Sequence, residues 1–182
     1  MLIGLVAAIA VIEYDGDEAQ KPAPGTIMVD DRALLPELVE RLGAIEIAYA
    51  GTVHRFERDS AGAWFYHGAH SNNETTHGHV ADPAQAERIA KAFEIFGRTR
   101  MERRFELNTK ADEYGVVAPQ IFIMVYRPNE LQPLVRFAVG NVAPDGVSRY
   151  VLVVGTPLVV TIANYQIDLL LQLIDELKGG AR

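Results

Sequence analysis

Residues 45–67 read IEIAYAGTVHRFERDSAGAWFYH, and this stretch decides the fold class. Apolar residues alternate with Glu46 along its first part, which is typical of a β-strand that buries one face. Ala50–Gly51 and then Asp59–Gly62 supply turn residues that reverse the chain. The stretch therefore predicts an antiparallel meander of three strands. In its last strand, Trp64 and Tyr66 share one face and are expected in the core.

Helical patterns flank this meander. Residues 35–42 carry apolar side chains at helical spacing and are followed by a glycine. A longer helix is predicted from residue 83 to 96, because Asp82 is a suitable N-cap and a proline occupies the first helical position. A final helix is expected after Asn164 as its N-cap. Its apolar stripe consists of Ile167, Leu170, Leu171, Ile174 and Leu177.

The second half of the chain repeats the order of the first half. Alternating apolar residues predict strands at 120–126, 134–139, 148–154 and 158–161, ahead of the final helix. The predicted fold class is α+β, with two similar antiparallel meander-plus-helix units preceded by a short N-terminal membrane helix. The expected segments are an anchor at 1–14, a linker at 15–29, a first unit at 30–97, a connector at 98–118 and a second unit at 119–178.

The apolar run Leu2–Ile12 favours a membrane anchor, and acidic residues follow it. As a helix the first fourteen residues would be roughly 20 Å long, against a hydrocarbon core of about 30 Å. A processed signal peptide and a segment buried in the protein's own core are the alternatives. The expected location is the bacterial inner membrane, through a single-pass or short anchor, with the head in the periplasm or otherwise outside the cytoplasm. The anchor residues are Leu2, Leu5, Ile9 and Ile12.

Composition excludes several kinds of chemistry. The 182-residue chain has a net charge of −7, which argues against sequence-independent nucleic-acid binding. It contains no cysteine, so disulfides, thiolate catalysis and zinc–thiolate sites are excluded. With 49% hydrophobic residues the chain can build a substantial core.

A histidine-rich loop is the sharpest candidate for a metal site. Neutral imidazoles bind zinc, copper or nickel, and Glu74 could add an oxygen ligand. The alternative is a solvated polar loop, because serine, asparagine, threonine and glycine fill the same stretch. No other cofactor is predicted. The four candidate ligands are His67, His70, His77 and His79.

A cationic stretch follows the long predicted helix. It could face anionic lipid headgroups or an acidic partner. Nearby acidic residues, Glu102 among them, offset its charge, so a solvated connector is the favoured interpretation. The five cations are Arg98, Arg100, Arg103, Arg104 and Lys110.

Short catalytic signatures are missing from the sequence. None of the serines lies in a nucleophile-elbow pattern, and the phosphate-loop, zinc-protease and dinucleotide-binding motifs do not occur. Asp112 and Glu113 are adjacent on the connector, where neighbouring side chains seldom point the same way. The sequence therefore predicts a protein that is not an enzyme and has no catalytic residues.

Several short stretches, in this order, resemble a bacterial family of unknown function, family 4340. The likeness covers about residues 30–178. It implies membrane-anchored proteins with an extracytoplasmic head, often encoded beside gliding-type ABC transporter components, and it implies no catalytic residues. The matching stretches are Leu35-Pro36-Glu37-Leu38, Gly62-Ala63-Trp64, Val80-Ala81-Asp82-Pro83, Asp112-Glu113-Tyr114-Gly115-Val116 with Pro119, Val139-Gly140 and Arg149-Tyr150.

Together these features predict a non-enzymatic, membrane-anchored accessory subunit. Its head would bind or stabilise a larger membrane protein complex, with integral membrane subunits and the lipid bilayer as partners and no nucleic acid. One alternative is an auxiliary or binding component of an ABC-type transporter. Another is a periplasmic metal-binding protein that uses the histidine-rich loop.

Overall fold

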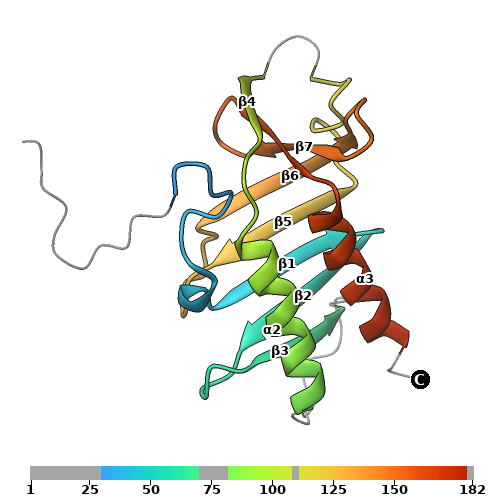
Figure 1. Cartoon of the computed structure of the whole chain (residues 1–182). Helices are drawn as coiled ribbons and strands as arrows, with labels where there is room; N and C mark the ends of the chain where they lie inside the picture. Colours follow the sequence, from blue (N-terminus) through green and yellow to red (C-terminus); the bar gives the residue numbers. More distant parts are fainter. Residues whose placement is uncertain (1–29, 70–81, 108–110, 180–182) are drawn as a thin grey trace, which may run out of the picture.

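A computed structural model describes residues 30–69, 82–107 and 111–179. Eight strands form one antiparallel sheet in the order β3-β2-β1-β5-β6-β7-β8-β4 (Figure 1). The strands are β1 (Ala44–Tyr49), β2 (Thr52–Arg58), β3 (Trp64–Ala69), β4 (Arg103–Glu106), β5 (Ile121–Tyr126), β6 (Val135–Val142), β7 (Ser148–Val153) and β8 (Leu158–Ala163). The helices are the 3₁₀ turn η1 (Val39–Arg41), α2 (Pro83–Gly97) and α3 (Tyr165–Gly179).

The predicted division into two meander-plus-helix units is wrong, because the strands of both halves belong to one sheet. The joint is the pair β1–β5, which runs antiparallel from Ala44 opposite Tyr126 to Tyr49 opposite Ile121. Ile45 and Ile47 of β1 and Ile123 of β5 are almost fully buried at this joint. Separating the halves would expose this apolar surface and leave two sheet edges unpaired, which disfavours independent units.

Both long helices lie on the same face of the sheet (Figure 1). Apolar side chains from alternate positions of the strands pack against the helices on this face. Phe93 of α2 packs against Phe56 of β2 and Trp64 of β3, with ring centroids 5.1 and 4.8 Å apart. Trp64 is 2% exposed, which confirms the prediction that it lies in the core. On α3 the residues Ile167, Leu170 and Ile174 are buried against the same core.

Two local predictions need correction. The helix expected at 35–42 is only the 3₁₀ turn η1, because the backbone is extended on both sides of this turn, at Leu38 and at Leu42. The connector at 98–118 contains a strand, β4, which pairs with β8 at the end of the sheet. Its charged residues gave no apolar alternation, and only the neighbouring strand shows that this segment is extended.

The predicted transmembrane helix is a further correction. Within the described ranges, no helix is long and apolar enough to cross a membrane. α2 and α3 have 15 residues each, about 22 Å of helix, and both place one polar face outward. The membrane-helix classification and the single-pass inner-membrane location are therefore wrong on this finding. Leu2, Leu5, Ile9 and Ile12, which were predicted as the anchor, lie outside the described residues.

The N-terminus of α2 allows a direct test of its cap. The carboxylate of Asp82 accepts hydrogen bonds from the backbone N–H groups of Ala84, at 2.9 Å, and Gln85, at 3.1 Å. We expect Asp82→Ala to lower the free energy of unfolding by about 1 kcal/mol, because two N–H groups lose their acceptor. Urea denaturation followed by circular dichroism measures the loss. Asp82→Asn keeps an acceptor oxygen and should retain most of the stability, and an equal loss in both variants would contradict the capping role.

Candidate polar cavity at the start of helix α3

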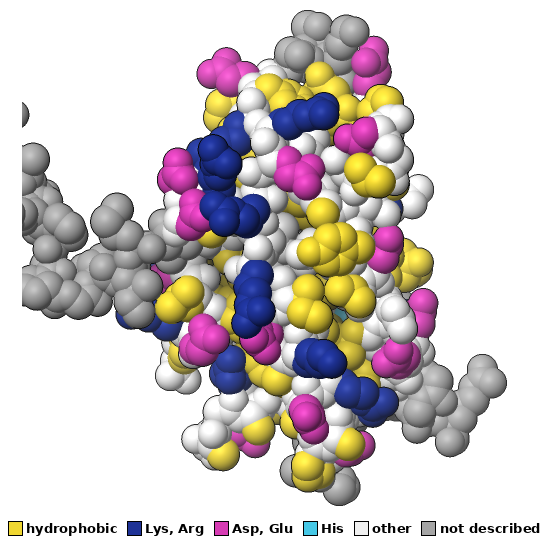
Figure 2. Space-filling view, in the orientation of Figure 1, with side chains coloured by type: hydrophobic (Ala, Val, Ile, Leu, Met, Phe, Trp, Pro, Cys, Tyr) yellow, Lys and Arg dark blue, Asp and Glu magenta, His cyan; other side chains and the backbone are white. Residues whose placement is uncertain are grey.

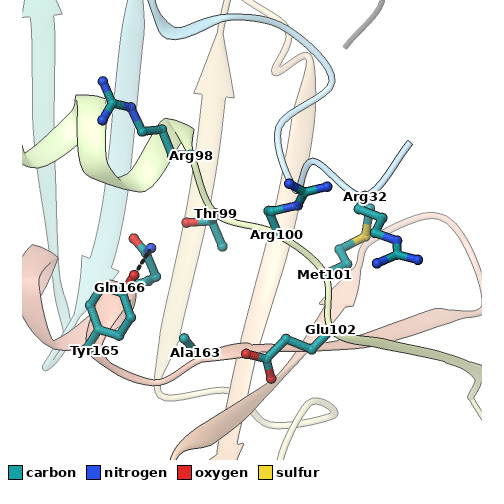
Figure 3. A pocket seen from close by; sticks show the side chains of 9 residues that line it. All are labelled: Arg32, Arg98, Thr99, Arg100, Met101, Glu102, Ala163, Tyr165 and Gln166. Atoms are coloured by element: carbon teal, nitrogen blue, oxygen red, sulfur yellow. Dashed lines mark hydrogen bonds between the residues drawn. The ribbon is translucent and has the colours of Figure 1, made fainter. Parts of the chain in front are cut away.

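A cavity of about 370 Å³ lies where the segment after α2 passes the start of α3 (Figure 3). Three stretches that are far apart in the sequence meet here: the segment before residue 34, the segment 98–102, and the junction between β8 and α3. The cavity is lined by Arg32, Arg98, Thr99, Arg100, Met101, Glu102, Ala163, Tyr165 and Gln166.

Backbone hydrogen bonds hold the segment 98–102 extended. The N–H of Leu34 donates to the carbonyl of Thr99 at 2.9 Å, and the N–H of Met101 donates to the carbonyl of Arg32 at 2.7 Å. On the other side the N–H of Glu102 donates to the carbonyl of Thr161 in β8 at 2.8 Å. This double pairing fixes where each side chain of the segment points, so the site is held by the sheet and not by a free loop.

Two buried polar side chains in the cavity each have one atom without a hydrogen-bond partner in the described part of the chain. Thr99 is 2% exposed and Gln166 is 5% exposed. The hydroxyl of Thr99 and the Oε1 atom of Gln166 contact no donor or acceptor among the described residues. Gln166 uses its Nε2 atom to donate to the hydroxyl of Tyr165 at 2.9 Å. Leaving a buried polar atom unpaired costs about 1–3 kcal/mol, so these two atoms mark a place where a ligand would be stabilised.

Cations border the same cavity. Arg32 and Arg100 lie together on one side of the segment, while Arg98 points away along α2 (Figure 3). Arg98 pairs with Glu94, and Arg100 pairs with Asp30. Arg32 makes no ion pair within the described residues. A guanidinium has five N–H donors, so a paired arginine can still donate to a second acceptor.

Asp30 contacts two of these residues, Arg32 through its backbone and Arg100 through its side chain. Its carboxylate accepts from the backbone N–H of Arg32 at 3.0 Å, and this bond is the main cause that lowers the pKa of Asp30. The charge of Arg100 lowers the same pKa further. Asp30 therefore stays ionised and keeps Arg100 at the border of the cavity.

One carboxylate also lines the cavity. Glu102 accepts a hydrogen bond through its Oε2 atom from the hydroxyl of Ser148 at 3.0 Å. No arginine of the cavity is among its partners in the described part of the chain. The cavity thus presents both a cationic and an anionic group.

Asn164 is predicted as the N-cap of the last helix, and it bonds the first turn of α3 mainly through its backbone carbonyl. Its carbonyl accepts from the N–H groups of Ile167 and Asp168, at 3.0 and 3.2 Å. Its side chain accepts from Arg149 and donates to Asp168. The first turn of α3 therefore begins beside the cavity with its N-terminal N–H groups and the positive end of its dipole.

The structure brings only part of the predicted cationic stretch together. Arg98 and Arg100 line the cavity, whereas Arg103 and Arg104 are exposed on β4. Lys110 lies outside the described residues. On this side of the molecule, Lys and Arg side chains follow one another down the surface (Figure 2). Sequence reasoning missed Arg32, Thr99 and Gln166, because no local pattern relates three positions that only the fold makes neighbours.

The predicted metal site is mostly outside the described part of the chain. His67 lies on β3, where its Nδ1 atom is 3.7 Å from Glu57. His70, His77 and His79 fall in the range 70–81, which the structure does not describe. Among the residues that it does describe, no group of three His, Cys, Asp or Glu could hold a metal ion. The metal site stays a prediction.

A second polar cluster lies on the sheet face opposite the helices. Arg55 binds the carboxylates of Glu46 and Glu57, and Tyr126 donates to Glu46 at 2.7 Å. Burial and this hydrogen bond raise the pKa of Tyr126 to about 12. Each charged group here has an opposite partner, so the cluster stabilises β1, β2 and β5 and leaves no unpaired group for a ligand.

The fold and the cavity together define a single-sheet protein with two helices on one face and a polar cavity at the helix–sheet junction. No family model, no curated protein and no solved structure matches the chain. The resemblance to family 4340 therefore stays a prediction.

Proposed function

We propose that the protein is a non-enzymatic binding protein whose cavity receives a small polar molecule that carries an anionic group, a carboxylate or a phosphate. The observation that carries this proposal is the pair of buried, unpartnered polar atoms of Thr99 and Gln166 in a cavity bordered by arginines. A volume of about 370 Å³ is within the range of small-molecule sites.

The charge pattern supports an anion. The chain as a whole carries a net charge of −7, so a local group of arginines stands out against the general charge of the protein. Arginine donates two parallel hydrogen bonds to a carboxylate or a phosphate. Arg32 supplies such a donor without an ion-pair partner in the described ranges, and the start of α3 adds a favourable dipole.

Among the roles predicted from the sequence, a small-ligand cavity favours the auxiliary or binding component of an ABC-type transporter. A subunit that only braces a protein complex does not require unpaired polar atoms on residues that line a cavity. A binding component needs them to hold its ligand.

Titration of the ¹⁵N-labelled full chain with sodium propionate and with inorganic phosphate, followed by NMR, tests the proposal. At least one of the two anions should bind in a saturable manner and shift the amide signals of residues 98–102. Arg32→Gln should weaken this binding by about tenfold, because a hydrogen bond to a charged group contributes about 1.5–3 kcal/mol.

Arg136→Gln is the matched control. Arg136 is exposed on β6, and alternation along this strand places it on the sheet face opposite the helices, so the variant removes the same charge away from the cavity. Its affinity for the anions should equal that of the original protein. An equal loss in both variants, or the absence of saturable binding for every small carboxylate and phosphate probe, would contradict the proposed function.

A further inference from the structure

The cavity has two sides of different chemistry. Arg32 and Arg100 lie together on one side of the segment 98–102, and the side chains of Thr99 and Glu102 turn to the other side (Figure 3). Gln166 and Tyr165 of α3 lie across from them. One side therefore offers hydrogen-bond donors with positive charge, and the other side offers oxygen atoms.

The side of the cavity that carries the oxygen atoms offers mainly hydrogen-bond acceptors. Glu102 supplies a carboxylate, which shares one oxygen with the hydroxyl of Ser148. Gln166 donates through Nε2 to Tyr165, so its unpartnered buried atom is the acceptor Oε1. The hydroxyl of Thr99, which is also unpartnered, can accept as well as donate. These three residues all line the cavity, and their acceptors suit an ammonium group, which has three N–H donors and no acceptor.

A simple anion would fit this arrangement less well than a ligand that also carries a positive charge. It would gain contacts with Arg32 and Arg100 but would also lie near the negative charge of Glu102. A small molecule that carries a positive group as well as a negative one replaces this repulsion with a second attraction, between its positive group and Glu102. A ligand with both groups also supplies donors to Thr99 and Gln166, which an anion lacks.

We propose that the cavity binds a small zwitterion of the α-amino acid type. This inference rests on the proposed function and adds the class of ligand to it. The carboxylate of the ligand contacts Arg32 and Arg100, and its ammonium group contacts Glu102, Thr99 and Gln166. Met101 and Ala163 line the remainder of the cavity with apolar surface that accommodates a short side chain.

Three probes of similar size separate the two sides of the cavity. L-alanine carries both charged groups, propionate carries only the carboxylate, and ethylamine carries only the ammonium. In NMR titrations of the ¹⁵N-labelled full chain, L-alanine should bind at least about tenfold more tightly than either single-charge probe. Its largest shifts should fall on the amides of residues 98–102 and 164–167.

Variants of the two sides supply a second readout. Glu102→Gln should weaken L-alanine binding by about tenfold and leave propionate binding unchanged or slightly stronger, because the repulsion is lost. Thr99→Val should also weaken L-alanine binding without lowering the melting temperature, since it removes a hydroxyl that is unpaired in the ligand-free protein. Glu106→Gln, an exposed change on β4, is the matched control and should bind L-alanine as the original chain does.

The outcomes distinguish the two proposals. Equal affinity for L-alanine and propionate, with no effect of Glu102→Gln, would overturn the zwitterion and leave the anion-binding function intact. Binding of ethylamine as tight as that of L-alanine would overturn both, because the arginines would then have no role. Absence of saturable binding for L-alanine, propionate and phosphate would also overturn both. Since the comparison of probes uses the unaltered chain, it does not depend on whether any variant folds.

Discussion

Phe93→Ala should lower the free energy of unfolding by about 3–5 kcal/mol. Phe93 is fully buried on α2 and makes edge-to-face contacts with Phe56 and Trp64, which belong to two different strands. Removing the ring takes away its transfer free energy and leaves a cavity under the helix, because the sheet on the other side cannot close the gap. Equilibrium urea denaturation followed by circular dichroism measures the change.

A surface variant provides the reference for this prediction. Leu131 is 94% exposed in the loop after β5, so Leu131→Ala should change the free energy of unfolding by less than about 0.5 kcal/mol. If Phe93→Ala destabilised the protein no more than Leu131→Ala does, the packing of α2 on β2 and β3 would be wrong.

The second large effect is a loss of stability in acid that depends on His54. His54 is fully buried on β2, and its Nδ1 atom lies 2.7 Å from the hydroxyl of Tyr66. The pKa of His54 is lowered from 6.5 to about 4; burial is the main cause, the charge of Lys178 contributes to the lowering, and the charge of Asp175 opposes it. The folded protein therefore keeps this imidazole neutral.

The direction of the pH dependence follows from this pKa. The unfolded chain takes up a proton on His54 near pH 6.5, and the folded chain does so only near pH 4. Stability from this residue is complete above pH 6.5 and is lost as the pH falls toward 4. The loss amounts to about 3 kcal/mol, since each unit of pKa difference corresponds to about 1.4 kcal/mol.

His54→Gln tests the assignment. Glutamine does not titrate in this range and can still bond to Tyr66, so the variant should lose much less stability between pH 6.5 and pH 4 than the original chain. Urea denaturation at a series of pH values gives the slope. His67→Gln leaves His54 in place and should keep the loss assigned to it. An unchanged slope in His54→Gln would show that the burial of this imidazole does not govern acid stability.

The cavity illustrates what sequence reasoning could reach. Arg98 and Arg100 belong to a cationic stretch that the sequence predicts to be a solvated connector. Only the fold shows that these arginines line a cavity, because the other lining residues come from distant parts of the chain. Arg32 lies near the start of the described residues, and Gln166 lies in the first turn of α3. A buried glutamine beside an apolar stripe gives no signal in the sequence, because exposed glutamines are common at the ends of helices.

Local features were determined by the sequence itself. Three features depend on neighbours only a few residues apart: the strands of the first meander, the start of α2 at the Asp82 cap, and the burial of Trp64. Turn residues, caps and apolar periodicity are therefore enough to predict them. The sheet order is different. Whether β1 pairs with β5, and whether the charged segment Arg103–Glu106 joins β8, is decided by which edges bury the most apolar surface when all strands are present. The polar cavity depends on the same pairing, because the segment 98–102 is held between residues 32–34 and β8 only in the complete tertiary structure.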